Sequence, residues 1–494
     1  MPSLLDWLDS PPLPNAADEL ACLHRQLATL RTSQVSLQQR ASILERLYER
    51  SMSTVTALLG SLADAVLLIP IPRKTRQLIR SLQVLLQALA EDFLTTLSLK
   101  DDHSAAGLRQ EAGLALWRSL HTLAQHLLIS NLAASPAAVG IWRQLHQTYE
   151  IARHLELAGD TPEGVASTLQ NVYYSAILLD CAQPASFTSR EVNFVAAYLA
   201  LFSDGVSPAD KAAGQAPEVF WIDPTQDAAA FACSRKTAPP DTPVHYFSCA
   251  RLAARLKEQL AELDAGASAE QIKLPDFAET PAGRGVLQRL VTYWGDPGKR
   301  RYPRRRQNYR ATLCSGLDSL WRLFQDGKAA TIETSSWMIT NESPDGYAFM
   351  HVSGKIGGIS VGDITAIRTD SGKNWQICIV RWALSENQEH LELGLQILAT
   401  RAVSARLALP SHNSEHTHLS VLILPAIREL RSTEMLVVPS GSLEDQPTRL
   451  VLIVEKENIK VREVTRTRLD EQNSQIAVFS IEPVRLASTP PELG

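Results

Sequence analysis

The chain has 494 residues, of which 45% are apolar and 20% charged, and its formal net charge is −5. This length exceeds what one ordinary hydrophobic core can serve, so it predicts several domains, and the composition is that of a soluble globular protein. The weak net charge excludes a general attraction to nucleic acid or membranes, so any anion site must be local.

The sequence indicates neither a targeting segment nor a disulfide framework. The opening stretch, MPSLLDWLDSPPLP, lacks the basic region and long apolar core of a signal peptide, and the most apolar run, Ala65–Pro72, is too short to span a bilayer. The six cysteines are scattered and form no C-x-x-C pair. We therefore expect a cytoplasmic protein with reduced thiols, no membrane insertion and no zinc knuckle.

Residues 1–205 are predicted to form an all-helical domain. Asn15 is suited to cap the first amphipathic helix, and Thr188 with Glu191 has the spacing of a capping box at a later helix. The apolar positions of the first helix recur at helical spacing: Leu20, Leu23, Leu27 and Leu30.

A smaller mixed α/β segment is predicted at 216–296. It follows a stretch rich in Gly, Pro, Ser and Asp, Ser203–Pro217, which is typical of a linker. Within the segment, EVFWID and VHYFSC predict short strands, whereas ARLAARLKEQLAELDAG predicts a helix that ends at Gly266. A second helix is expected at Leu287–Trp294.

The rest of the chain is predicted to be β, which makes the fold class multidomain α+β. Residues 298–402 contain short β-branched and aromatic runs divided by turn residues, which favours a small closed antiparallel barrel. One intervening stretch, SGLDSLWRLFQDG, is less strand-like and is interpreted as a helical insertion. Residues 403–488 predict a second β domain, either a barrel or a sandwich.

Three histidines lie close together in the connector between these β regions. His412, His416 and His418 form H-x-x-x-H-x-H beside Glu415, a pattern that could bind a metal ion. The pattern lies in a polar connector with no fixed scaffold, so we favour an ordinary loop and expect no metal site.

A basic run precedes the first β region. The stretch KRRYPRRRQNYR holds seven basic residues, and Asp296 is the one acidic residue between positions 296 and 310. Arginine suits phosphate oxygens, purine faces and the O6/N7 edge of guanine. A solvated or nucleic-acid-attracting charge run is the simpler interpretation, yet Arg306 and Arg310 form an R-x-x-x-R that leads directly into a predicted strand.

A polar turn follows the next predicted strand. The stretch TNESPDG contains Asn341, Ser343 and Gly346 in the pattern N-x-S-x-x-G. Asn and Ser offer short hydrogen-bonding groups close to the backbone, and Gly can adopt positive φ and admit a ligand against bare backbone. Taken alone the pattern is typical of many Asx and Ser turns.

Together, in this order and in a β context, the two motifs resemble the PilZ domain, the bacterial receptor domain for cyclic di-GMP. The resemblance covers residues 298–402 and implies that arginines wrap the phosphates and guanines of the ligand while the polar turn hydrogen-bonds it. The residues that the resemblance assigns to ligand binding are Arg305, Arg306, Arg310, Asn341, Ser343 and Gly346.

Two features depart from the family pattern. The interval between Arg310 and Asn341 is longer than we expect, which fits the helical insertion. The arginine register is also open, because Arg300 with Arg304, and Arg301 with Arg305, satisfy R-x-x-x-R equally well. We prefer Arg306 and Arg310 because they adjoin the strand.

The resemblance implies a bacterial signalling effector that takes cyclic di-GMP as its ligand and needs no cofactor. Binding at the arginine-rich linker and barrel would be coupled to the helical domain, which would dock an unidentified protein partner. Control of motility or biofilm formation would be the output. These points are analogies of fold and ligand.

Two other classes of function stay open. A PilZ-like scaffold without a ligand is one, and nucleic-acid binding through the arginine run, with Tyr302 and Tyr309 available for stacking, is the less favoured other. Neither G-x-x-x-x-G-K-[ST] nor H-E-x-x-H, two common catalytic signatures, occurs in the sequence. We therefore expect no catalytic residues and no enzyme.

Overall fold

A computed structural model gives the fold of the chain. It describes residues 2–64, 69–98, 105–211, 216–298, 302–326, 332–386, 390–409, 417–426, 433–443, 446–455, 458–472 and 475–484. The chain divides into two compact units: residues 1–67 with 71–300, and residues 68–70 with 301–494. In the described part of the chain, no helix combines the length and apolar character needed to cross a bilayer.

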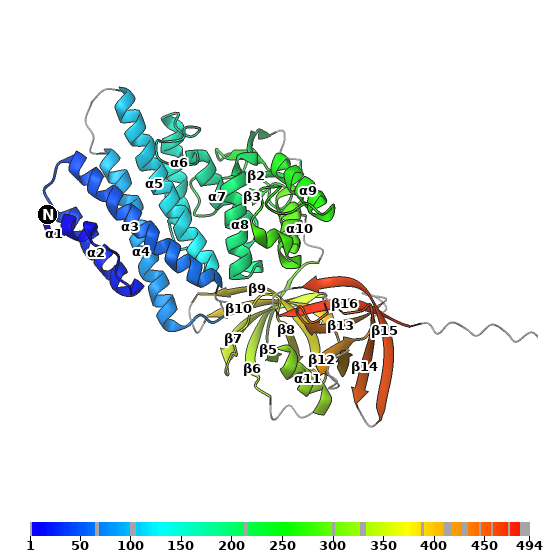
Figure 1. Ribbon diagram of the computed structural model, residues 1–494. Coiled ribbons are helices and arrows are strands. Elements are labelled where there is room, and N and C mark those ends of the chain that lie inside the picture. Colours follow the sequence, from blue (N-terminus) through cyan, green and yellow to red (C-terminus); the bar gives the residue numbers. More distant parts are fainter. Residues whose placement is uncertain are drawn as a thin grey trace, which may run out of the picture. The chain divides into compact units, whose positions relative to one another are not determined.

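The first unit is built mainly from helices, coloured blue to green in Figure 1. The predicted caps are confirmed, because the Asn15 side chain accepts a hydrogen bond from the Ala17 N–H, and Thr188 and Glu191 form a reciprocal capping box. The sequence prediction omitted a short helix before Asn15. The helices are α1 (Pro2–Asp9), α2 (Ala16–Thr32), α3 (Leu37–Asp64), α4 (Arg73–Ser98), α5 (Ala105–Leu132), α6 (Ile141–His154), α7 (Leu169–Cys181), α8 (Ser189–Phe202), α9 (Ala250–Asp264) and α10 (Pro281–Gly295).

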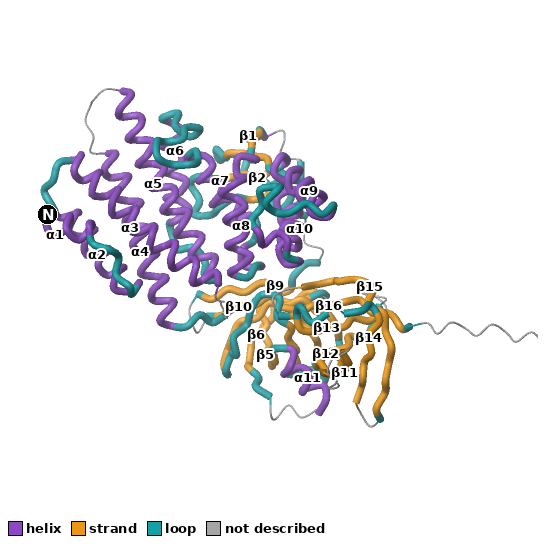
Figure 2. The backbone as a smooth tube through the Cα atoms, in the orientation of Figure 1, coloured by secondary structure: helices purple, strands orange, loops and turns teal. Residues whose placement is uncertain are grey.

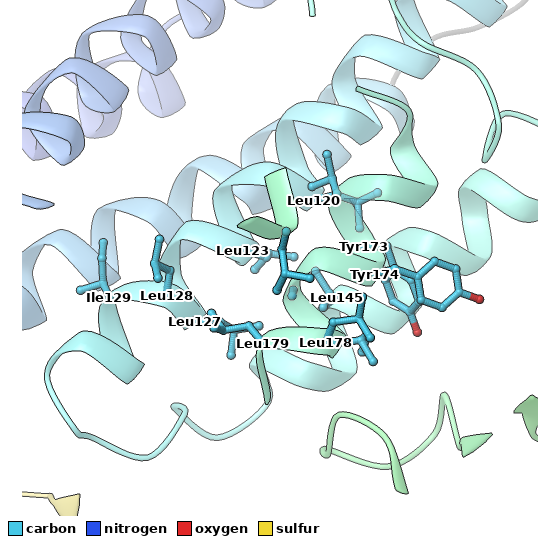
Figure 3. Packing of buried hydrophobic residues seen from close by; sticks show 14 of the residues in the cluster. Leu120, Leu123, Leu127, Leu128, Ile129, Leu145, Tyr173, Tyr174, Leu178 and Leu179 are labelled. Atoms are coloured by element: carbon cyan, nitrogen blue, oxygen red, sulfur yellow. The ribbon is translucent and has the colours of Figure 1, made fainter. Parts of the chain in front are cut away.

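One hydrophobic cluster runs through this unit, from Leu4 to Trp294. Figure 3 shows part of it, where leucines of α5 meet Leu145 of α6 and Tyr173, Tyr174, Leu178 and Leu179 of α7. The helices and the mixed segment that follows them therefore share one core.

A four-stranded sheet completes the first unit, in the order β1-β4-β2-β3. The strands predicted from EVFWID and VHYFSC are present as β2 (Val219–Ile222) and β4 (His245–Ser248), and β3 is Phe231–Ala232. The linker prediction is wrong at β1 (Ser207–Ala209), which pairs with β4. Pro208 misled the sequence interpretation, but β1 is an edge strand, where proline is tolerated.

The second unit contains two closed six-stranded antiparallel barrels, whose strands are orange in Figure 2. The first barrel has the order β10-β7-β6-β5-β8-β9 and the second has β11-β12-β13-β16-β15-β14. Their strands are β5 (Arg305–Ser315), β6 (Ser335–Ser343), β7 (Gly346–Ser353), β8 (Ile364–Thr369), β9 (Gln376–Ser385), β10 (Leu391–Ala399), β11 (Val403–Leu409), β12 (Thr417–Leu424), β13 (Glu434–Pro439), β14 (Arg449–Glu455), β15 (Ile459–Gln472) and β16 (Ile476–Pro483).

The predicted helical insertion is confirmed as α11 (Leu317–Asp326), which packs on both barrels. Leu320 and Leu323 join a buried cluster that takes residues from the first barrel, such as Ile377, and from the second, such as Val437. The Trp321 indole N–H donates to the Ala405 carbonyl of β11 at 2.8 Å. Because they share this apolar cluster, the two barrels are held in a fixed arrangement with each other.

The histidine pattern falls mostly outside the described residues. His412, Glu415 and His416 lie there, and His418 is on β12, paired with Ala408. No group of three or more metal-binding side chains occurs among the residues that the structure describes.

Candidate functional site

The Asn341 stretch forms a tight hairpin at one end of the first barrel. β6 continues through Ser343 and β7 begins at Gly346, so only Pro344 and Asp345 lie between the paired strands. The Ser343 hydroxyl donates to a carboxylate oxygen of Asp345 at 2.6 Å. The polar groups of the hairpin are therefore fixed by strand pairing and by local hydrogen bonds, as expected from the sequence.

The reason for the glycine at position 346 differs from the sequence expectation. Gly346 is a strand residue and has no positive φ. A Cβ atom built on it would lie 2.1 Å from the carbonyl oxygen of Leu395 on β10. Glycine is thus required here by the close approach of β7 to β10, which closes the barrel, and not by a left-handed backbone.

β-Bulges cluster around this hairpin. The β6–β7 register shifts between Ile339 and Asn341, and the β9–β10 register shifts opposite Gly394 and Leu395, where Arg381 is left without a paired partner. A third shift, between Arg306 and Tyr309, interrupts the β5–β6 pairing. Bulges turn side chains away from their regular alternation, and they are frequent at barrel rims and ligand sites. Here they change the side-chain directions on β5, β6 and β9 at the same end of the barrel.

The arginine run enters the first barrel beside the hairpin. Arg306 is paired with Asn341 and Arg305 with Glu342, whereas Arg310 is paired with Met338, three residues before Asn341. At ~3.3 Å per residue, Arg310 lies about 10 Å along the strand from the hairpin. Residues 299–301, which include two of the alternative motif arginines, lie outside the described part of the chain.

A cavity of about 280 Å³ lies at this rim. Three of the six predicted site residues, Asn341, Ser343 and Gly346, line it, whereas Arg305, Arg306 and Arg310 do not. The lining adds residues from the middle of the arginine run, the hairpin and the β9–β10 bulge. The full lining is Arg304, Asn341, Glu342, Ser343, Asp345, Gly346, Tyr347, Ala348, Arg381, Trp382, Gly394, Leu395 and Gln396.

The charged groups of this lining balance one another: Arg304 and Arg381 are cationic, and Glu342 and Asp345 are anionic. Further positive charge is available beside the cavity from Arg305 and Arg306, which are exposed. Among the described residues neither of these two side chains takes part in a hydrogen bond or ion pair.

Glu342 is held by neutral donors. Gln307 donates to its carboxylate at 3.0 Å, and the Tyr309 hydroxyl donates to the same oxygen at 3.1 Å. Burial raises the pKa of Tyr309, and the hydrogen bond to the Glu342 carboxylate raises that pKa further. Tyr309 therefore stays protonated at neutral pH and orients Glu342 instead of stacking freely, as the nucleic-acid interpretation would need.

Sequence reasoning missed the β9–β10 side of the cavity. Arg381 and Trp382 follow a regular strand pattern, and only the bulge places both beside the hairpin. One signal was present in Gly394, a glycine inside a strand pattern, which indicates a bulge or a close approach. A Cβ atom there would lie 1.8 Å from the Trp382 indole.

Two segments of the chain match family models for different domains of the same receptor. Residues 322–403 match the family described as "Cyclic-di-GMP receptor FimW, middle PilZ domain". The chain carries a PilZ domain. The resemblance stated from the sequence is thereby confirmed for this segment, which holds the Asn341 hairpin and the β9–β10 bulge. The segment begins after the arginine run, so the match does not test the arginine assignments.

The similarity extends beyond the PilZ domain. Residues 2–211 match the family described as "Cyclic-di-GMP receptor FimW, N-terminal domain". A protein of Pseudomonas aeruginosa named "Cyclic-di-GMP receptor FimW" is 21% identical to this chain, and the alignment covers 98% of this chain and 91% of that protein. The likeness therefore includes the helical segment and the second barrel as well as the PilZ domain.

Replacing Gly346 by alanine tests the close approach that shapes the cavity. The added methyl group must displace the Leu395 carbonyl, so we expect the unfolding free energy of the second unit to fall by about 1–3 kcal/mol, the usual cost of overpacking. Gly357→Ala is the matched control, since a Cβ atom at that position meets nothing within 4 Å. Denaturant unfolding measures both, and equal effects would contradict the assignment.

Proposed function

We propose that the chain is a receptor for cyclic di-GMP and that the ligand binds at the rim of the first barrel, with no catalytic step. The observation that carries this proposal is the convergence of the Asn341 hairpin, the β9–β10 bulge and the entry of the arginine run on one cavity. The described similarity to a cyclic di-GMP receptor supports the choice of ligand. The six free cysteines fit a reducing compartment, so we place the activity in the cytoplasm.

Because the charges of the cavity lining cancel, the proposed binding of an anionic ligand needs the arginine run. Cyclic di-GMP carries two phosphate charges, whereas the charged groups of the cavity lining cancel. Arg305 and Arg306 therefore supply the positive charge for the phosphates through charge-assisted, two-point hydrogen bonds. The cavity, at about 280 Å³, is slightly smaller than the usual ligand pocket of about 300–1,000 Å³, so it would take part of the dinucleotide while the arginines cover the rest.

The other residues have distinct proposed roles. Asn341 and Ser343 hydrogen-bond the part of the ligand inside the cavity, and Gly346 keeps β10 close enough to form its wall. Arg310 lies farther along β5 and would reach the second half of the dinucleotide. We add Arg304 to the proposed contacts, because this residue lines the cavity.

Binding would also act on the connection between the two units. The basic run crosses the boundary between them, since the first unit ends at Arg300 and the second begins at Arg301. Closely spaced guanidinium groups repel one another until an anion neutralises them, so the ligand would order this segment. We propose that this ordering changes how the helical unit presents itself to a protein partner, with motility or biofilm formation as the output.

Titration calorimetry tests ligand binding. We expect the double variant Arg306→Ala/Arg310→Ala to bind cyclic di-GMP about a hundredfold more weakly than wild type, because two charge-assisted contacts are lost, at about 3 kcal/mol or more together. Arg449→Ala, which removes an exposed arginine at the start of β14 in the second barrel, is the control and should leave the affinity unchanged.

Two results would contradict this assignment. A folded wild-type chain that gives no heat with cyclic di-GMP would favour an interaction scaffold without a ligand. Salt-dependent binding to any oligonucleotide that cyclic di-GMP fails to displace would favour nucleic-acid binding through the arginine run.

Hydrogen exchange and small-angle scattering test the coupling. Saturating cyclic di-GMP should slow amide exchange over residues 302–310 and change the radius of gyration of the full chain, since the ligand would hold this segment against the barrel rim. The control is the Arg306→Ala/Arg310→Ala chain at the same ligand concentration. If wild type binds the ligand but neither amide exchange nor the radius of gyration changes, the proposed coupling is wrong and the proposed binding is unaffected.

A further inference from the structure

Arg381, a residue of the cavity lining, is held by the neighbouring barrel through side-chain hydrogen bonds. Its Nε–H donates to the side-chain oxygen of Gln396 at 2.6 Å. Its two terminal nitrogens donate to the two carboxylate oxygens of Glu471, one of them at 3.0 Å. Gln396 also lines the cavity, but Glu471 does not and belongs to β15 of the second barrel.

Local backbone irregularities place both members of this pair. Arg381 is the residue skipped by the β9–β10 pairing. On β15, the register with β16 shifts between Leu469 and Glu471, so Asp470 is skipped and Glu471 resumes the pairing beside it. Bulges redirect side chains, and here one bulge in each barrel brings an arginine and a glutamate together. Without these two bulges, the regular alternation of side chains along β9 and β15 would not bring Arg381 and Glu471 together.

The packing of the two barrels fixes the position of Glu471 relative to Arg381. Both barrels contribute to the buried cluster around α11, so Glu471 approaches Arg381 from a fixed direction. Arg381 is 38% exposed and Glu471 is 32% exposed, so water competes with the pair. An ion pair at that exposure contributes little to stability, whereas it strongly restricts the orientation of a long side chain with much rotamer freedom.

The geometry leaves a defined part of the guanidinium for a ligand. A guanidinium has five N–H groups, and three are occupied by Gln396 and Glu471. Two N–H groups and the planar face remain, and they are held in a fixed orientation at the cavity. Such an arginine is suited to hydrogen-bond or stack on a purine nucleotide, and its net charge is largely balanced by Glu471.

We propose that Glu471 of the second barrel is a positioning residue for the nucleotide site of the PilZ domain, acting through Arg381. This inference rests on the proposed function and assigns a role in that site to the second barrel. The second barrel is then a part of the receptor site, since it sets the orientation of a group that contacts the ligand. Gln396 fixes the same guanidinium from within the first barrel.

A double-mutant cycle tests this role. Calorimetry with cyclic di-GMP is carried out on wild type, Arg381→Ala, Glu471→Ala and the double variant, all as full chains. We expect Arg381→Ala and Glu471→Ala each to weaken binding about tenfold, and the double variant to bind no more weakly than Arg381→Ala. Residues that act as one unit are non-additive in such a cycle, whereas a general loss of barrel stability would add to the effect of Arg381→Ala.

The control is Glu434→Ala, which breaks the pair between Arg462 and Glu434 in the second barrel. The exposed fractions of that pair, 36% and 28%, match those of Arg381 and Glu471. Glu434→Ala should leave the affinity unchanged, and thermal unfolding of each variant shows whether it is folded. The variant Arg381→Lys, which keeps the charge but loses the planar fork, should bind as weakly as Arg381→Ala.

Each contrary result identifies what fails. Unchanged or tighter binding by Glu471→Ala would overturn the positioning role, and tighter binding would show that Glu471 competes with the ligand for Arg381. If the cycle is additive, Glu471 acts on the fold alone. If wild type binds but Arg306→Ala/Arg310→Ala loses affinity while the Glu471 variants do not, only this inference fails. No binding by wild type overturns the proposed function and this inference together.

Discussion

Two strands of the first barrel approach each other so closely at Gly346 that no side chain fits between them. The pairing of Gly346 with Gln396 brings β7 against β10 and closes the six-stranded barrel. The Ile397 N–H also donates to the Asp345 carbonyl of the hairpin turn at 2.9 Å. This closure places the Asn341 hairpin beside the β9–β10 bulge, and the cavity exists because the two features meet.

The electrostatics of the site divide between the barrel and the segment before it. The barrel supplies shape, hydrogen-bonding groups and a balanced set of charges. The arginine run supplies excess positive charge at the cavity entrance, in a chain whose formal net charge is −5. Under the proposed function an anionic ligand would need both parts, and this dependence would give the segment at the unit boundary a physical reason to respond to the ligand.

Much of the fold could be predicted from the sequence because local signals agreed with the final structure. Alternating β-branched and aromatic residues located most strands, and the capping residues Asn15 and Thr188 marked helix starts that the structure confirms. β11 carries a weaker strand signal, since Val403–Leu409 contains alanines and an arginine in place of a continuous β-branched run. Its Arg406 stays near the surface, beside Glu455 and over the Trp321 ring.

The candidate site was predictable only in part. The hairpin residues could be found because they are close in sequence and follow a known pattern. Arg381 and Gln396 could not, since their positions at the cavity depend on a register shift between strands that pattern alone does not reveal. Glu471 is separated from Arg381 by 90 residues and lies in another barrel, so its approach depends on how α11 packs against both barrels.

The most direct test of the account is a crystal structure of the full chain with cyclic di-GMP. The account predicts ligand density in the cavity at the end of the first barrel, in contact with Asn341 and Ser343 and covered by the arginines at the start of β5. Ligand bound elsewhere, with the arginine side chains directed away from the hairpin and no group of the ligand inside the cavity, would contradict it.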